Sequence, residues 1–291
     1  MRHLPGDIFE ILNTKYQSLT KSEKKIANYL FNHQNEIIQM PITTMAEECK
    51  VAEATIFRFC KALDYEGYNE FKLALAKSIF MTDAPNPTSL PPSYGKVEAN
   101  DSFTEMCEKL YSSQLSALEQ TFKLLDKDRI EKAVEILSKA QRVYCMGQGA
   151  SLLMAMEAWG RFSTASSKFS CIEDSHFQAM SASLFGEDDV ILFFSYSGAT
   201  RDMTDVMRYV QANKTKVILV TKFEKSPAAA HASVVLLCDS NEGPLQVGSV
   251  AAKVAQLLVI DVLFNEFCRA NAEMSLKNIE ITADASARKL I

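Results

Sequence analysis

Residues 190–200 read VILFFSYSGAT, and this stretch decides the fold of the C-terminal part of the chain. The five apolar residues that open it are typical of a strand buried on both faces of a sheet. Ser195 to Thr200 then form a turn before a segment with helical periodicity. Three hydroxyls, a glycine and the free N–H groups of a helix N-terminus suit such a turn to a phosphate. A serine-rich turn with no ligand is the alternative.

Short apolar runs alternate with helix-like segments over the rest of this part. Helices are expected at 103–125 and 128–139, then near 150–164, 174–184, 200–212 and 225–231, and a long amphipathic helix, about 247–269, closes the domain. The strands are expected at Arg142–Met146, Lys168–Cys171, Asp189–Phe194, Thr215–Thr221 and Ser233–Cys238. This pattern predicts an α/β domain whose five-stranded parallel sheet is covered by helices on both faces.

A proline-rich segment divides the 291 residues. Four of the eight prolines lie within residues 82–95, a composition that cannot continue a helix or a central strand. The sequence therefore predicts an all-α domain at 1–80, a linker at 81–101 and the α/β domain at 102–291. Both domains have ordinary sizes.

Composition narrows the class of protein. No window has the roughly 18 apolar residues of a membrane span, and no apolar run follows the N-terminal charges, so we expect a cytoplasmic protein. The seven cysteines contain no C-x-x-C pair and are interpreted as reduced, buried residues. The four histidines lie far apart, and neither a metal nor a cofactor is expected.

Helix signals in the first domain indicate a helix-turn-helix. Thr20 and Glu23 have the spacing of a capping box, and Thr44 and Glu47 repeat it. Over 44–63, a small residue, an apolar turn residue and a core anchor follow at the required spacing, namely Ala46, Val51 and Ile56.

The second helix of this motif, about Glu53 to Leu63, is the expected DNA reader. Its outward face has residues suited to base edges and phosphates, namely Ala54, Thr55, Arg58 and Lys61. The alternative is an ordinary helical hairpin. Residues 1–80 contain ten basic and ten acidic residues, which argues against indiscriminate coating of nucleic acid and permits selective binding through one local face.

Three blocks in this domain resemble the N-terminal domain of the RpiR family of bacterial transcriptional regulators: LTKSEKKIA at 19–27, ATIFRFCKAL at 54–63 and GYNEFK at 67–72. The resemblance implies a helix-turn-helix joined to a sugar isomerase (SIS) domain that senses phosphosugars. Three residues depart from the pattern. Lys50 and Asp64 stand where glycine is favoured, and Ala52 replaces a capping serine.

The same resemblance assigns ligand residues in the second domain. Gly147, Gly149 and Ser151 are similar to the first SIS motif, and the second, around Gly198, implies that Ser195, Ser197 and Thr200 hold phosphate. A dinucleotide fingerprint is the weaker interpretation of Gly147 and Gly149, because Leu152 stands where the third glycine belongs.

Three further side chains are candidate sugar contacts. Asp174 and His176 follow the second strand; alternatively, Asp174 caps the next helix and His176 packs beneath it. Lys253 stands where the family has arginine, and its alternative is a solvated helix face.

These observations predict a DNA-binding regulator of carbohydrate metabolism, not an enzyme. Its expected partners are an operator, an inverted repeat, read by a homodimer or tetramer, and a phosphorylated sugar or amino sugar. One alternative is a phosphosugar isomerase with Glu157 or His176 as its base. Another is an adaptor whose helical domain binds protein rather than DNA. Protein binding should respond modestly to ionic strength, whereas operator binding should weaken steeply.

Overall fold

The computed structural model describes residues 8–83, 97–98, 100–240 and 248–289. The chain divides into two compact units, one of residues 1–112 with 241–249 and one of residues 113–240 with 250–291. Most of the expected linker lies outside the described residues, but its first three residues belong to a helix that ends at Asp83. No described helix is long and apolar enough to cross a membrane.

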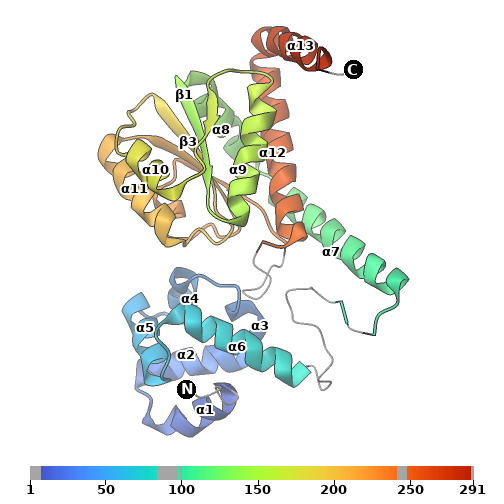
Figure 1. Ribbon diagram of the computed structural model, residues 1–291. Coiled ribbons are helices and arrows are strands. Elements are labelled where there is room, and N and C mark those ends of the chain that lie inside the picture. Colours follow the sequence, from blue (N-terminus) through green and yellow to red (C-terminus); the bar gives the residue numbers. More distant parts are fainter. Residues whose placement is uncertain (1–7, 84–96, 99, 241–247, 290–291) are drawn as a thin grey trace. The chain divides into compact units, whose positions relative to one another are not determined.

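The first unit is helical, as Figure 1 shows. Its core unites the apolar faces of its helices around the buried rings of Phe59 and Phe71. The elements are α1 (Ile8–Lys15), a 3-10 turn (Tyr16–Ser18), α2 (Lys21–Asn32), α3 (Gln34–Ile37), α4 (Ile42–Glu48), α5 (Glu53–Ala62) and α6 (Tyr68–Asp83).

One of the two expected capping boxes is present. Thr20 accepts a hydrogen bond from the Glu23 N–H, and the Glu23 carboxylate accepts one from the Thr20 N–H, so α2 begins as predicted. The second prediction is wrong, because α4 begins at Ile42 after Pro41 and Thr44 lies inside it. Proline presets the backbone next to a helix start, and this competed with the threonine signal.

The turn between α4 and α5 has the geometry of a helix-turn-helix. Lys50 takes a left-handed conformation (φ 53°), and the Val51 N–H donates to the Ala46 carbonyl at 2.9 Å. This bond and the one from Lys50 to Glu47 form a Schellman motif, which ends α4. Ala52 is the N-cap of α5 and has no side-chain cap bond, as expected from the missing serine.

The second unit contains a five-stranded parallel sheet of order β2-β1-β3-β4-β5, which confirms the predicted fold class. The strands are β1 (Arg142–Gly147), β2 (Phe169–Cys171), β3 (Asp189–Phe194), β4 (Lys216–Thr221) and β5 (Val234–Leu237). The helices are α7 (Phe103–Leu124), which begins in the residues grouped with the first unit, α8 (Lys127–Lys139), α9 (Ala150–Ser163), α10 (Ser175–Ala182), α11 (Arg201–Asn213), α12 (Val250–Ala270) and α13 (Ala272–Ala287).

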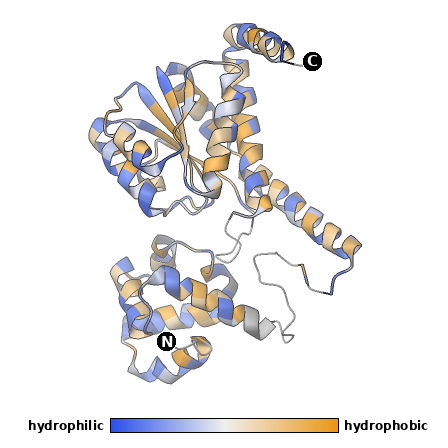
Figure 2. Cartoon of the chain, viewed as in Figure 1, coloured by the Kyte–Doolittle hydropathy of each residue, from blue (hydrophilic) through white to orange (hydrophobic). Residues whose placement is uncertain are grey.

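Two apolar cores cover the sheet. Alternate residues of β3 point to opposite faces: Leu192 packs with α8, α9 and α12, whereas Phe193 packs with α10 and α11. Figure 1 shows these two helical layers, and Figure 2 shows hydrophobic residues on the strands and on α9 and α12. Because β3 is buried throughout, as its unbroken apolar run predicts, the polar turn that follows it is held by a rigid support.

Three expectations about local structure are corrected. Residues 225–231 form only a 3-10 turn at Ala229–His231, since Pro227 prevents a regular helix. The sheet-bearing unit does not end with α12, because α13 follows it, tied down by bonds from Asn278 and Thr282 to carbonyls at the end of α9. Cys107 is exposed, so not every cysteine is a buried residue.

Candidate functional site

The strand order places one crevice at the carboxyl edge of the sheet. Successive crossovers leave β1 in one direction and β3 in the other, and ligands of open α/β sheets bind at such a switch point. β1 and β3 are adjacent and in register to their last residues, where Gly147 pairs with Phe194. The two predicted motifs, 147–151 and 195–200, therefore leave the sheet side by side.

Backbone hydrogen bonds, one to the neighbouring strand β4 and one within the loop, fix the loop after β3. The Ser195 N–H donates to the Val220 carbonyl at 3.0 Å, and the Gly198 N–H donates to the Ser195 carbonyl at 3.1 Å. Gly198 has φ 61°, and a Cβ there would lie 2.1 Å from the Ser226 hydroxyl oxygen. This position therefore accepts only glycine, for reasons of both conformation and space.

The hydroxyls of this loop differ in their surroundings. Ser195 is buried and Ser197 is exposed. Thr200 is the N-cap of α11 and makes no side-chain cap bond; its buried hydroxyl has no hydrogen-bond partner in the described part of the chain. An unpaired buried hydroxyl beside free helix N–H groups is an unsatisfied polar site of the kind an anion completes.

The loop after β1 leaves the sheet beside the loop after β3. Gly147 allows the start of α9 to approach closely, since a Cβ would lie 2.6 Å from the Ser151 carbonyl oxygen. Gly149 is the N-cap of α9, and Ser151 lies partly exposed in the first turn. Leu152, in the first turn of α9, packs against the core and stands in place of the third glycine of a dinucleotide fingerprint.

Gln178 is a structural residue of the site that the sequence did not reveal. It is fully buried on α10, and its Nε2 donates to the carbonyls of Gly147 (3.1 Å) and Ile172 (2.6 Å). Its Oε1 accepts from the Gln148 side chain at 2.6 Å. One amide thus fixes the exits of β1 and β2, and nothing in its sequence context distinguishes it from other helical polar residues.

The other candidate sugar contacts are placed as follows. Asp174 caps α10, its Oδ1 accepting from the N–H groups of His176 (2.9 Å) and Phe177 (3.0 Å). His176 is exposed, so the alternative that it packs beneath α10 is wrong. Lys253 lies half-buried in the first turn of α12. Since β2 pairs with β1, the loop with Asp174 and His176 leaves the sheet next to Gly147.

The predicted DNA-reading residues share one face of α5. Ala54, Arg58 and Lys61 are exposed and Thr55 is partly exposed, whereas Ile56 and Phe59 are buried on the opposite face. The Arg58 guanidinium donates to the Ala54 carbonyl and to the Thr55 hydroxyl, both at 3.3 Å.

An apolar ring also belongs to this surface, although the sequence analysis did not single it out. The Lys61 ammonium lies 5.6 Å from the centre of the Phe57 ring, which is 45% exposed. A cation and an aromatic side chain flanking an arginine suit the phosphates and methyl groups of a DNA groove.

A helix-turn-helix followed by a parallel α/β unit with this loop defines a two-domain class of regulator, and comparison with known proteins agrees. Residues 6–81 match the helix-turn-helix domain of the rpiR family, and residues 136–266 match the SIS domain. An uncharacterized HTH-type transcriptional regulator of Haemophilus influenzae is 30% identical over 259 residues, covering 89% of each chain. One of Clostridium perfringens is 31% identical over 261 residues, covering 90% of this chain and 91% of its own.

The chain therefore belongs to the RpiR family of HTH-type transcriptional regulators with a SIS domain. The solved structure of the Vibrio vulnificus NanR protein complexed with ManNAc-6P is similar across its whole length, with a TM-score of 0.86 and 25% identity. That match covers 98% of this chain and 100% of the NanR chain.

The tight contact at Gly198 yields a stability prediction. In Gly198→Ala, the new methyl group overlaps the buried Ser226 side chain and the backbone is strained, so we expect the sheet-bearing unit to lose about 2 kcal/mol or more. Thermal unfolding measures the loss. Gly160→Ala is the matched control: apart from its chain neighbours and its own helix backbone, no heavy atom lies within 4 Å of its Cβ position, and alanine in a helix should raise stability by up to about 1 kcal/mol. Equal melting temperatures for the two variants would contradict the contact.

Proposed function

We propose that this regulator binds a phosphorylated sugar between the loops 147–151 and 195–200, and that the bound sugar changes its affinity for an operator in genes of carbohydrate metabolism. The observation that carries the proposal is the buried, unpaired Thr200 hydroxyl at the N-terminus of α11, next to Ser195 and Ser197. Hydroxyls and helix amides supply several donors to a multiply charged phosphate without burying a lysine.

The similarity to NanR supports an amino-sugar phosphate as the effector. That structure holds ManNAc-6P, and its fold matches this chain from the first domain to the last. In our proposal, Ser195, Ser197 and Thr200 hold the phosphate. The sugar hydroxyls then face Ser151, the Asp174–His176 turn and Lys253.

A regulator is favoured over an isomerase by the state of the candidate bases. Glu157 and His176 are both exposed, and within the described chain neither side chain has a hydrogen-bond partner. An isomerase base must be held beside C1 and C2 of the sugar, and its pKa is set by its neighbours. The helix-turn-helix, moreover, has no role in isomerisation.

The first test concerns the phosphate. Ser197→Ala removes one donor to a charged group, so we expect about 1.5 to 3 kcal/mol weaker binding of ManNAc-6P, with unchanged operator affinity in the absence of ligand. Isothermal titration and operator-binding titrations measure the two quantities. Ser167→Ala, at an exposed serine in the turn between α9 and β2, is the control. If Ser197→Ala has the same ligand dose-response as the wild type, the phosphate is not held by this loop.

The second test concerns DNA. Arg58→Ala should weaken operator binding by about 1 to 3 kcal/mol and lower the slope of affinity against salt concentration by about one, leaving ManNAc-6P binding intact. Fluorescence anisotropy at several salt concentrations measures both. Arg208→Ala removes the same charge from the exposed surface of α11 and should leave operator binding unchanged. Wild-type affinity and slope in Arg58→Ala would show that α5 is not the DNA reader. A slight salt dependence of the wild type would favour a protein partner instead.

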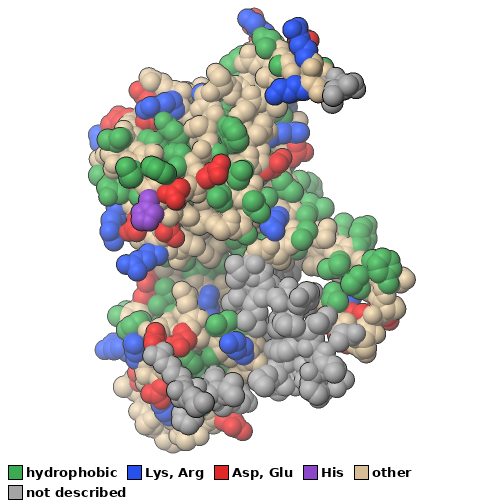
Figure 3. Space-filling view, in the orientation of Figure 1, with side chains coloured by type: hydrophobic (Ala, Val, Ile, Leu, Met, Phe, Trp, Pro, Cys, Tyr) green, Lys and Arg blue, Asp and Glu red, His purple; other side chains and the backbone are tan. Residues whose placement is uncertain are grey.

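The third test concerns assembly, for which we propose a homodimer or tetramer formed by SIS domains. One small recognition helix reads few bases, and symmetry doubles its contacts on an inverted repeat. Figure 3 shows hydrophobic side chains at the surface of the sheet-bearing unit. Exposed apolar residues on α9 and α10, and just after α10, include Leu153 (51% exposed), Phe177 (61%) and Leu184 (84%). Exposed apolar residues on these elements support the proposal that SIS domains associate there. Sedimentation velocity at micromolar concentration should show dimers or tetramers, and monomers alone, with or without ManNAc-6P, would refute the proposal.

A further inference from the structure

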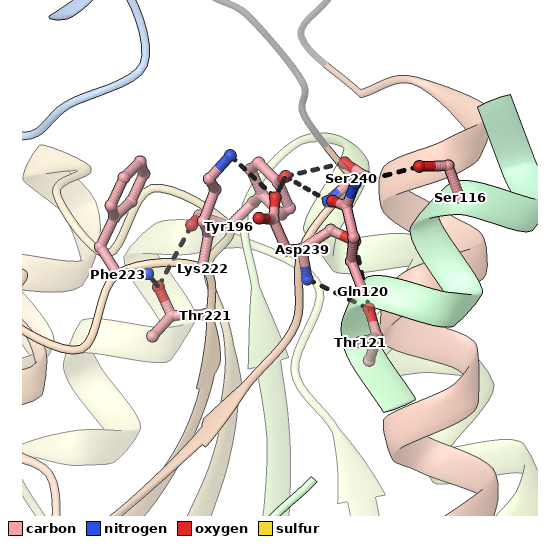
Figure 4. Close-up of polar contacts among 9 residues, drawn as sticks. All are labelled: Ser116, Gln120, Thr121, Tyr196, Thr221, Lys222, Phe223, Asp239 and Ser240. Atoms are coloured by element: carbon pink, nitrogen blue, oxygen red, sulfur yellow. Dashed lines mark hydrogen bonds and ion pairs between the residues drawn. The ribbon is translucent and has the colours of Figure 1, made fainter. Parts of the chain in front are cut away.

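Tyr196 stands between the two serines of the proposed phosphate loop, but its side chain points toward the end of β5. Its hydroxyl accepts a hydrogen bond from the Ser240 N–H at 3.0 Å and lies 2.7 Å from the Ser240 Oγ. It also donates to the Asp239 carboxylate at 3.5 Å. Figure 4 shows the ring reaching across to these two residues. The loop is thereby joined to the strand exit two positions away in the sheet.

The buried surroundings of Tyr196 strengthen its bonds to Ser240. Burial raises the pKa of its hydroxyl, which therefore remains protonated and able to donate. Asp239 is held from a second side by the Lys222 ammonium at 2.8 Å, in an ion pair whose side chains are 12% and 25% exposed. Hydrogen bonds in such partly dry surroundings are worth more than at a wet surface.

Both backbone groups of Asp239, its N–H and its carbonyl, are hydrogen-bonded to helix α7. The hydroxyl of the buried Thr121 donates to the Asp239 carbonyl and accepts from the Asp239 N–H, each at 3.1 Å. In Figure 4, Thr121 lies on α7 opposite the end of β5. A buried threonine that pairs with both backbone groups of one residue fixes the helix to that point.

The backbone of Tyr196 is also fixed by hydrogen bonds, which come from residues at the end of β4. Its carbonyl accepts from the Lys222 N–H at 3.0 Å and from the Thr221 hydroxyl at 3.2 Å. Any change of backbone at Ser195 to Ser197 must therefore move the Tyr196 ring or break these bonds. The ring in turn contacts Asp239 and Ser240, which contact α7.

We propose that Tyr196 and Thr121 are positioning residues that couple the phosphate loop to helix α7 through Asp239 and Ser240. The inference rests on the proposed function of the loop as an effector site. It adds the route by which the occupied loop acts. In the described chain, α7 is the first helix after the helix-turn-helix domain, and α8 and β1 follow it. A change in the loop therefore alters the stability of the helix that leads from the DNA-binding domain into the sheet-bearing unit.

Hydrogen exchange of the full-length protein without ligand tests the link itself. Tyr196→Phe removes only a hydroxyl, and we expect amides in residues 113–124 to exchange about three to ten times faster, as for the loss of one buried hydrogen bond. Thr121→Val should give a similar increase. Because both lie on one path, the double variant should exchange no faster than Thr121→Val alone.

Two matched controls remove the same groups elsewhere in the unit. Tyr144→Phe changes a half-buried tyrosine of β1 that is stacked on Phe185, and Thr215→Val changes a buried threonine whose hydroxyl has no partner among described residues. Both should leave exchange in 113–124 as in the wild type. Wild-type exchange there in Tyr196→Phe, or effects of the two substitutions that add in full, would overturn the coupling.

A second measurement adds ManNAc-6P as the probe and separates the two proposals. In the wild type, the ligand should slow exchange in residues 195–200 and alter it in 113–124. In Thr121→Val, the first effect should persist and the second should fall at least threefold. Persistence of both effects in that variant would contradict the inference. Absence of any effect of ManNAc-6P and other hexose 6-phosphates on 195–200 in the wild type would instead contradict the proposed function, and the exchange data without ligand would still decide the coupling.

Discussion

The parallel pairing of β1 with β3 is the constraint on which the rest of this structure depends. Register between the strands continues to their last residues, so the two polar loops begin at the same height on one edge of the sheet. A shift of one residue would turn every side chain of β3 to the other face and separate the loops. Because β3 is buried over its whole length, such a shift is strongly opposed. The rigidity of an apolar strand thus determines where polar side chains can meet.

At that edge, polar groups are satisfied unevenly. The Gln178 amide and the Tyr196 hydroxyl each make several hydrogen bonds, whereas Thr200 keeps a buried hydroxyl unpaired in the described chain. Well-packed supports around an incompletely paired group are typical of a preorganised site, since the cost of ordering has been met before a ligand arrives. The engaged residues position the loop, and the unengaged one is available to a ligand.

In the helix-turn-helix, tertiary packing compensates for unfavourable local conformations. Lys50 and Asp64 occupy left-handed conformations that glycine adopts at lower cost, and Ala52 cannot cap α5. Each departure costs about 1 kcal/mol in isolation. The turn keeps its geometry because the Schellman bonds of α4 and the buried core beneath α5 outweigh these local losses. Sequence departures in a motif therefore lowered local stability without changing its shape.

Much of the molecule was determined by the sequence by itself. The apolar run at 190–194, the alternation of strands and helices, the Thr20 capping box and the three blocks of the first domain were enough for the fold class, the family and the two loops, because periodicity and turn chemistry are local properties. Two predictions from local sequence were wrong because a nearby proline competed with them. Thr44 does not begin a helix, since α4 begins at Ile42 after Pro41, and residues 225–231 form only a 3-10 turn next to Pro227.

Only the tertiary structure decided which polar residues support the site. The bond from Gln178 to Gly147 joins residues 31 positions apart, that from Tyr196 to Ser240 joins residues 44 apart, and that from Asp239 to Thr121 joins residues 118 apart. A glutamine, a tyrosine and a threonine of this kind have no periodicity or spacing that marks them, since their partners are brought near only when the sheet forms. The sequence therefore predicted the two loops of the candidate site, whereas packing determined which residues hold those loops in place.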